Sequence, residues 1–279
     1  MIPPIADRFV AGESPAEAIQ HAQAVNQRGV SVILNLLGEH YHERGPADED
    51  AEAYIRLLED IETADVDACV SVKPSQVGLN VGVHVFRENM ERITEQAARR
   101  DVFVWIDMED HTTTDATIDT YEQLAYRYEG GVGLAIQANL KRTEDDLERL
   151  ADVPGKIRLV KGAYDEPAEI AYKRKEEVNR VYREYMEFMF EEFDDGAVAI
   201  GSHDPQMIEF AKQLYDEYGT DFEFQMLMGV RTDEQYALAR EYEMWQYVPY
   251  GGKWFSYFYR RAMERKENLL FAVRAVLGR

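Results

Sequence analysis

The chain has 279 residues, of which 46% are hydrophobic, which is enough to bury the core of one large domain and argues against disorder. Its 53 acidic and 31 basic residues give a formal net charge of -22. Because so acidic a surface repels phosphate backbones and anionic lipid headgroups, the composition argues against a nucleic-acid-binding protein and against stable adhesion to a membrane through a basic patch.

Carboxylates dominate several short runs, including residues 47–51, 142–148 and 191–195. Like charges this dense repel one another unless concentrated salt screens them. We therefore predict a salt-adapted, halophilic cytoplasmic protein. We expect its melting temperature, measured by thermal unfolding, to rise between low salt and molar potassium chloride, and an unchanged value would contradict the prediction.

The single cysteine, Cys69, lies in an apolar, strand-like run and cannot form an internal disulfide. This fits a reducing compartment and a role in core packing. No signal peptide is evident, and the longest apolar stretches are strand-sized rather than the ~20 residues that span a bilayer. We expect a soluble, cytoplasmic protein with at most peripheral contact at the inner face of the cell membrane.

Short apolar or β-branched runs alternate with amphipathic helical segments along the chain. Helical spacing is clear at residues 14–28, which open with a Ser-Pro cap, and at residues 166–192, whose tyrosine, methionine and phenylalanine positions are expected to face inward. Residues 45–48 are expected to form a loop after the first strand. The predicted strands lie near residues 30–36, 67–73, 102–107, 132–137, 157–161, 197–201, 222–226 and 244–248.

This alternation predicts an α/β fold in which parallel strands are joined by helical crossovers. Eight repeats favour closure into a (βα)8 TIM-type barrel, and no linker divides the chain, so residues 1–279 are predicted to form a single domain. A doubly wound open sheet is the alternative, but no Gly-x-Gly-x-x-Gly turn follows the first strand.

Seven successive strands, from the second to the eighth, are predicted to deliver polar side chains to one rim, where the active site of a barrel lies. Several of these side chains are cationic and could neutralise a substrate carboxylate or a cofactor pyrophosphate. Asp107 is expected to pair with Lys73, and Glu39 could reach Arg158. The rim positions are Lys73, Asp107, Gln137, Arg158, Lys161, Ser202, His203, Gln225 and Tyr247.

A segment near the C-terminus places Tyr257, Arg260, Arg261 and Glu264 at positions i, i+3, i+4 and i+7, which share one face of a helix. Two adjacent guanidiniums can hold a carboxylate by paired hydrogen bonds, so this face suggests a site for a small carboxylic acid. The alternative is a solvated helix face with an ion pair between Arg260 and Glu264.

The chain also resembles a known family, the proline dehydrogenases, from residue 8 almost to the C-terminus. The motifs that carry the resemblance lie at residues 34–39, 70–73, 106–110, 158–164, 201–203, 222–227 and 247–251, the last continuing from Tyr257 to Asn268. The resemblance implies a monofunctional, FAD-dependent enzyme on a (βα)8 barrel distorted at its C-terminal helix. It would oxidise L-proline to 1-pyrroline-5-carboxylate, the first step of proline catabolism to glutamate, and pass two electrons to FAD and then to a quinone or another acceptor. An oligomer is compatible with this resemblance.

The resemblance also implies roles for individual residues. Arg260 and Arg261 match a pair that clamps the proline carboxylate, and Lys73 assists them. Leu227, Tyr247 and Tyr257 match residues that enclose the ring, and Glu39 and Arg158 match an ion pair that closes over the substrate. The catalytic set is then Lys73, Asp107, Tyr247, Tyr257, Arg260 and Arg261, and the FAD contacts are Asp107, Gln137, Arg158, Val160, Lys161, Gly162, Ala163, Ser202, His203 and Glu264. No metal is implied.

Three other readings compete with this one. A metal-dependent hydrolase could use His40, His42, Lys161 and His203, which echo a barrel metal site although no aspartate ends the eighth strand. A Schiff-base lyase could use Lys161, but that chemistry needs a desolvated lysine. The third is a barrel that binds proline or another carboxylate without flavin.

Overall fold

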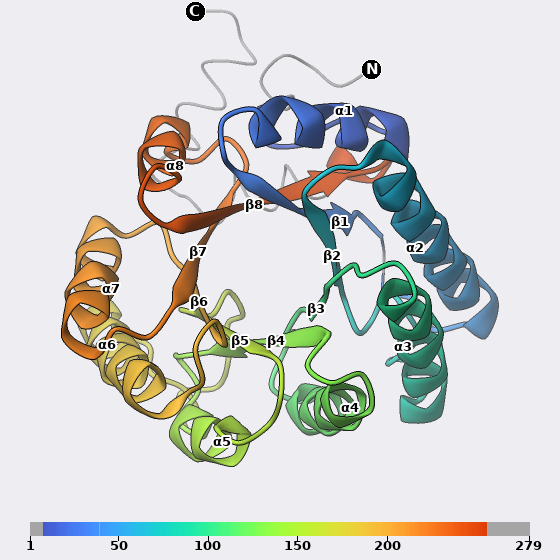
Figure 1. The fold of residues 1–279 in the computed structure, drawn as a ribbon. Helices are drawn as coiled ribbons and strands as arrows, with labels where there is room; N and C mark the ends of the chain where they lie inside the picture. Colours follow the sequence, from blue (N-terminus) through green and yellow to red (C-terminus); the bar gives the residue numbers. More distant parts are fainter. Residues whose placement is uncertain (1–7, 39, 256–279) are drawn as a thin grey trace, which may run out of the picture.

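In the computed structural model, which describes residues 8–38 and 40–255, eight parallel strands form a closed barrel ringed by helices (Figure 1). The strands run in the order β1 to β8, and β8 pairs in parallel with β1 to close the barrel. The strands are β1 (Ser31–Leu36), β2 (Ala68–Val72), β3 (Val104–Ile106), β4 (Val132–Gln137), β5 (Lys156–Val160), β6 (Val198–Gly201), β7 (Phe222–Leu227) and β8 (Glu243–Tyr250). The predicted (βα)8 barrel is confirmed.

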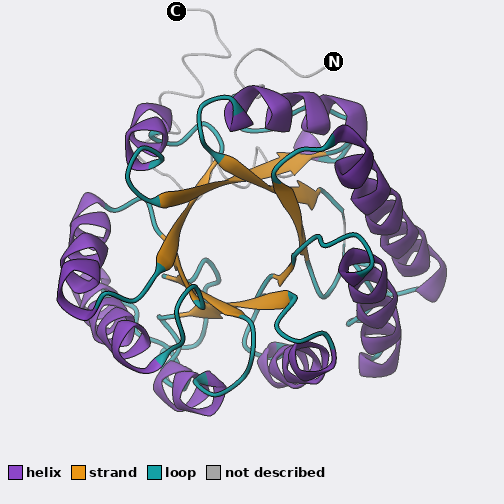
Figure 2. Ribbon diagram, in the orientation of Figure 1, coloured by secondary structure: helices purple, strands orange, loops and turns teal. Residues whose placement is uncertain are grey.

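Helices lie outside the strands all around the barrel (Figure 2). The described helices are α1 (Pro15–Asn26), α2 (Arg44–Ala64), α3 (Val83–Ala98), α4 (Thr114–Arg127), α5 (Thr143–Leu150), α6 (Lys175–Glu192), α7 (Pro205–Tyr218) and α8 (Thr232–Leu238). The expected distortion at the C-terminal helix concerns residues outside the described ranges.

The outer face of the strands is apolar because the helices cover it, whereas the inner face combines apolar side chains with buried polar ones such as Ser71 and Gln225. Outward side chains such as Val32, Leu34 and Val70 join the core between strands and helices. Inward side chains form a separate cluster of Ile33, Cys69, Trp105 and Ala199, with Phe103, Trp245 and Tyr247 packed against it. Cys69 is therefore a core residue, as predicted.

Gly133 on β4 makes room inside the barrel for a large ring. A Cβ atom at this position would lie 2.6 Å from two ring carbons of Trp105 and 2.9 Å from Phe103. The missing side chain lets Trp105 fill the interior below the barrel mouth, since closely packed interiors tolerate little extra volume.

Two local expectations were wrong. Residues 45–48 belong to the first turn of α2 rather than to a loop, because Pro46 lies among the first residues of the helix, whose N–H groups have no intrahelical partner. The helix predicted over 166–192 begins only at Lys175, because residues preceding it hydrogen-bond to the loop after β4: Tyr172 N donates to Asn139 O and Lys141 N to Ile170 O.

The cap predicted for the first helix is confirmed. Ser14 accepts from Glu17 N, and the Glu17 carboxylate accepts from Ser14 N at 3.0 Å, which forms a capping box. Within residues 8–38 and 40–255, none of the helices combines the length and apolarity needed to cross a bilayer.

Candidate active site

A cavity of about 870 Å³ lies at the carboxyl ends of the strands. All eight strands, or the residues that directly follow them, contribute to its lining. One residue for each strand, from β1 to β8, is Asn35, Lys73, Asp107, Gln137, Arg158, Gly201, Gln225 and Tyr247. The rim predicted from the strand ends is thus one continuous surface.

Four donors converge on the Asp107 carboxylate. Ser71 Oγ donates to Oδ1 at 2.7 Å, and Arg158 Nη2 donates to the same oxygen at 2.5 Å. Lys73 Nζ donates to Oδ2 at 2.5 Å, and Tyr247 OH donates to it at 2.7 Å. The predicted pairing of Asp107 with Lys73 is confirmed, and the same carboxylate also fixes side chains from β5 and β8.

The charge of this cluster is set by opposing effects. Burial alone would raise the pKa of Asp107, but the charges of Lys73 and Arg158 hold that pKa well below its usual range. Burial would lower the pKa of Lys73, yet its partner Asp107 raises that pKa. The carboxylate therefore stays ionised, and the lysine keeps its proton at neutral pH.

Arg158 is almost fully buried in the cavity wall, with a side chain 5% exposed. Besides Asp107, its guanidinium donates from Nη1 to Gln225 Oε1 at 3.0 Å. It also lies 4.9 Å from the ring centre of Trp105 and 5.6 Å from that of Tyr247. Hydrogen bonds and ring contacts together fix both the position and the plane of this cation.

The loops after β5 and β6 form the other side of the cavity. Lys161 Nζ donates to Asp204 Oδ2 and to Asn179 Oδ1, both at 2.6 Å. Gly162 has a φ of 102°, a region that favours glycine, and a Cβ there would lie 2.0 Å from Asn139 Oδ1. His203 Nε2 accepts from Leu227 N at 2.8 Å, which ties the β6 loop to the end of β7.

The structure brings together all twelve site candidates that fall within the described residues. They are Lys73, Asp107, Gln137, Arg158, Val160, Lys161, Gly162, Ala163, Ser202, His203, Leu227 and Tyr247, and each lines the one cavity. The remaining candidates, Glu39, Tyr257, Arg260, Arg261 and Glu264, lie outside the described residues.

The cations expected at the rim within the described residues, Lys73, Arg158 and Lys161, line the cavity, and the other two, Arg260 and Arg261, lie outside those residues. Four cations, Lys73, Arg158, Lys161 and Lys175, face four carboxylates, Asp107, Glu109, Asp165 and Asp204. The described lining therefore carries equal numbers of cationic and anionic side chains.

Three residues that matter here were missed. Ser71 binds Asp107, Trp105 lies against Arg158, and Glu109 accepts from Ser75 N at 2.6 Å and from Ser75 Oγ at 2.8 Å. Ser71 and Trp105 lie on β2 and β3, two positions before Lys73 and Asp107, and side chains two apart on a strand share one face. This period of two could have identified Ser71 and Trp105, whereas Glu109 lies beyond the end of β3.

Three residues of the metal-site alternative, His40, Lys161 and His203, line the cavity, but their contacts do not fit a metal site. His40 Nδ1 lies 3.9 Å from Glu109 Oε1, His42 is exposed, and His203 is engaged by Leu227 N. Within the part of the chain that the structure describes, no group of three or more His, Cys, Asp or Glu residues could hold a metal ion. The Schiff-base alternative needs an uncharged lysine, whereas Lys161 is held in an ion pair with Asp204.

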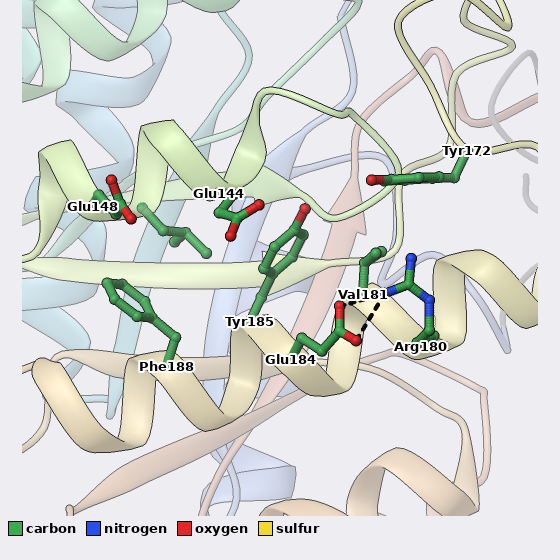
Figure 3. Close-up of a pocket in the computed structure, with 9 residues that line it drawn as sticks. Glu144, Glu148, Tyr172, Arg180, Val181, Glu184, Tyr185 and Phe188 are labelled. Carbon is green, nitrogen blue, oxygen red and sulfur yellow. Dashed lines mark hydrogen bonds and ion pairs between the residues drawn. The ribbon is translucent and has the colours of Figure 1, made fainter.

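A second, smaller cavity of about 170 Å³ lies outside the barrel between α5 and α6 (Figure 3). Tyr185 and Phe188 line it together with Arg180, whose Nη1 donates to Glu184 at 2.7 and 2.8 Å. None of the predicted site residues lines it.

Fold and cavity together define a (βα)8-barrel protein of the enzyme type, with a fixed ionic cluster at the mouth. Residues 18–274 match the family described as "Proline dehydrogenase". The chain therefore belongs to the proline dehydrogenase family.

Relatives match at nearly full length, and two of them illustrate the likeness. Proline dehydrogenase 2 of Bacillus subtilis is 34% identical over 275 residues, covering 97% of this chain and 90% of the relative. The proline dehydrogenase of Deinococcus radiodurans is 37% identical over 282 residues, with 98% and 90% covered.

Solved structures share the fold. Proline utilization A from Bdellovibrio bacteriovorus aligns with a TM-score of 0.85 and 20% identity over 93% of this chain. The protein of that name from Corynebacterium freiburgense aligns with a TM-score of 0.80 and 23% identity over 96% of this chain. The alignments cover 32% and 31% of those chains, so this chain spans about a third of their length.

Proposed function

We propose that this chain oxidises L-proline to 1-pyrroline-5-carboxylate, the first step of proline catabolism, with FAD as its cofactor. One observation carries the proposal beyond family membership: the twelve described site candidates, drawn from seven strands and their following loops, line one cavity. A quinone or another acceptor would then remove the electrons, with peripheral membrane contact where that acceptor is a quinone.

The cavity fits a flavin in size and chemistry. Its volume of about 870 Å³ lies in the range of roughly 300–1,000 Å³ typical of ligand and cofactor sites. Asn35 lines it, and its buried Oδ1 has no hydrogen-bond partner within residues 8–38 and 40–255. Gly201 lines it as well, and because a Cβ there would lie 2.7 Å from Val160 and 3.3 Å from Arg158, the glycine lets the cavity wall pack closely.

The residues that would hold FAD are those whose positions match the family's contacts. Within the described residues they are Asp107, Gln137, Arg158, Val160, Lys161, Gly162, Ala163, Ser202 and His203. When bound, FAD supplies the acceptor for a hydride and so for the two electrons that proline loses.

Lys73 and Tyr247 would position the substrate. The Lys73 side chain is 29% exposed, and its ammonium offers donors to a carboxylate while Asp107 fixes its place. Tyr247 shares that carboxylate and lines the cavity, so its ring is held where it can limit movement of the pyrrolidine. Arg260 and Arg261 would complete the grip on the proline carboxylate.

Oxidation then requires a fixed ring and an unprotonated ring nitrogen. The C5 hydrogen would leave with its electron pair to the acceptor that FAD supplies, and the nitrogen lone pair would form the C=N bond. The iminium that results then loses its N–H proton to water to give 1-pyrroline-5-carboxylate. Clamping the carboxylate favours this step because it holds the reacting carbon in one orientation. The buried Arg158 adds a fixed positive charge at the cavity wall, which stabilises negative charge that develops in the cavity.

The test is anaerobic addition of L-proline to the purified protein. We expect a yellow preparation whose visible absorbance bleaches with proline. A colourless protein with stoichiometric zinc would instead favour the hydrolase, and a colourless protein without zinc that still binds proline would favour simple binding.

The substrate clamp has its own test. In Arg260→Lys we expect flavin to stay bound while the KM for proline rises by about tenfold or more, because lysine cannot supply paired donors to a carboxylate. The matched control is Arg180→Lys, which makes the same exchange on the outer face between α5 and α6 and should leave KM unchanged. Unchanged kinetics in Arg260→Lys would remove that residue from the clamp.

A further inference from the structure

A chain of hydrogen bonds runs along the barrel interior, from the partly exposed Lys156 to the active-site cavity. Lys156 Nζ donates to Glu223 Oε2 at 2.5 Å, and Gln225 Nε2 donates to Glu223 Oε1 at 2.5 Å. Gln225 Oε1 accepts from Arg158 Nη1 at 3.0 Å, and Arg158 Nη2 donates to Asp107 at 2.5 Å. The chain thus begins at the amino end of β5 and ends at the cluster of Asp107.

The direction of this chain is fixed by its two ends. An ionised Glu223 can only accept hydrogen bonds, and the Arg158 guanidinium can only donate them. Gln225 lies between them, so only one orientation of its amide satisfies both neighbours. The nitrogen must face Glu223 and the oxygen must face Arg158, as observed.

Keeping the Glu223 carboxylate buried at this position costs free energy. It is 2% exposed, and burial raises the pKa of its carboxyl, an effect that the neighbouring Lys156 partly offsets. Lys156, whose side chain is 26% exposed, is the cation that compensates the buried charge. Apolar side chains of similar volume would fill the interior without this cost, which points to a role in orienting its neighbours.

We propose that Glu223, together with Lys156, is a positioning residue that orients the Gln225 amide and thereby holds the Arg158 guanidinium in the wall of the active-site cavity. The effect expected on turnover rests on the proposed function, whereas the effect expected on the orientation of Arg158 is independent of it.

Glu223→Gln is expected to reverse the direction of this chain of hydrogen bonds. The new amide offers one oxygen where the carboxylate offered two, and Lys156, which can only donate, keeps that oxygen. The new NH2 group then faces Gln225, whose amide turns over and presents its own NH2 to Arg158. Two donors now oppose each other, and the guanidinium leaves its place over Trp105.

The double variant Glu223→Gln with Lys156→Met is expected to restore the original direction of the hydrogen bonds. Without the ammonium, the oxygen of the new amide is free to accept from Gln225 Nε2, so the Gln225 oxygen again faces Arg158. The control Glu243→Gln removes a carboxylate from the neighbouring strand, opposite Glu223 in register. Glu243 accepts a hydrogen bond from Trp245 Nε1 and, within residues 8–38 and 40–255, makes none to Lys156, Gln225 or Arg158.

The experiment measures the NMR resonance of the Arg158 Nε–H group, identified by its absence in Arg158→Lys, since the rings of Trp105 and Tyr247 shift it while the guanidinium lies against them. It also measures kcat/KM for proline. We expect the resonance to move in Glu223→Gln and kcat/KM to fall roughly tenfold, with both restored in the double variant and unchanged in Glu243→Gln.

The resonance separates this proposal from the proposed function. A wild-type protein that does not oxidise proline would refute the function and leave the resonance test intact. A wild-type resonance in Glu223→Gln, or a double variant as perturbed as the single one, would overturn the positioning role.

Discussion

Replacing Asp107 with asparagine is expected to lower the free energy of unfolding by about 3 kcal/mol. The change removes the charge that balances Lys73 and Arg158, and Arg158 is almost fully buried. Removing one member of a buried ion pair typically costs about 3 to 5 kcal/mol, and the partial exposure of Lys73 places this case at the lower end. Urea unfolding at constant, molar potassium chloride measures the difference.

The same variant makes a prediction about acid. The pKa of Asp107 is lower in the folded protein than its ordinary value of 3.8, so its contribution to stability is present above that value and is lost as pH falls from there through the lower pKa of the folded protein. The difference in stability between the wild type and Asp107→Asn should therefore narrow below about pH 3.8. A constant difference down to pH 2 would contradict the depressed pKa.

The control for both measurements is Asp165→Asn. Asp165 also lines the cavity and pairs with a lysine, Lys173, but its side chain is 99% exposed. Water screens such a pair, so the midpoint of unfolding should not change. Equal losses in the two variants would show that burial is not the source of the Asp107 effect.

Replacing Arg158 with methionine is expected to lower kcat for proline oxidation by about a hundredfold or more. Removing a single preorganised donor from an active site typically costs ~10²–10³ in kcat. Arg158 is such a group, because Gln225, Asp107 and the rings of Trp105 and Tyr247 fix it in the cavity wall. Methionine keeps much of the length of the side chain and loses the charge and every donor.

Steady-state turnover, counted per bound flavin, separates this effect from loss of cofactor. Arg158→Lys should recover part of the rate, since it restores the charge without the planar fork. Arg180→Lys, on the outer face between α5 and α6, is the control and should keep the wild-type kcat (Figure 3). An Arg158→Met enzyme with near-normal kcat would remove this guanidinium from the reaction.

The rim of the active site could be predicted with few errors because the fold repeats a simple rule. Each apolar run ends where a parallel strand ends, and the closed barrel brings those ends together. Lys73, Asp107 and Gln137 could therefore be placed on one surface before their contacts were known. The errors lie between the strands. Residues 45–48 are helical because the first turn of a helix tolerates proline, and residues 166–174 are not helical because backbone groups there hydrogen-bond to the loop after β4.

This rule did not predict which side chains pair inside the barrel. The sequence indicated Asp107 with Lys73, but not that Ser71, Arg158 and Tyr247 share the same carboxylate. Glu223 and Lys156 drew no attention, because a charged residue in an apolar run carries no signal of its partner. They lie 67 positions apart and meet across the interior.

The sequence by itself therefore determined the class of fold, the family and the side of the barrel on which the polar residues gather, because these depend on hydrophobic pattern, motifs and strand polarity, which are local properties of the chain. Only the tertiary structure decided which charges pair and which way each amide faces. Those choices depend on the register with which eight strands close, and a hydrogen bond is made or lost within fractions of an ångström.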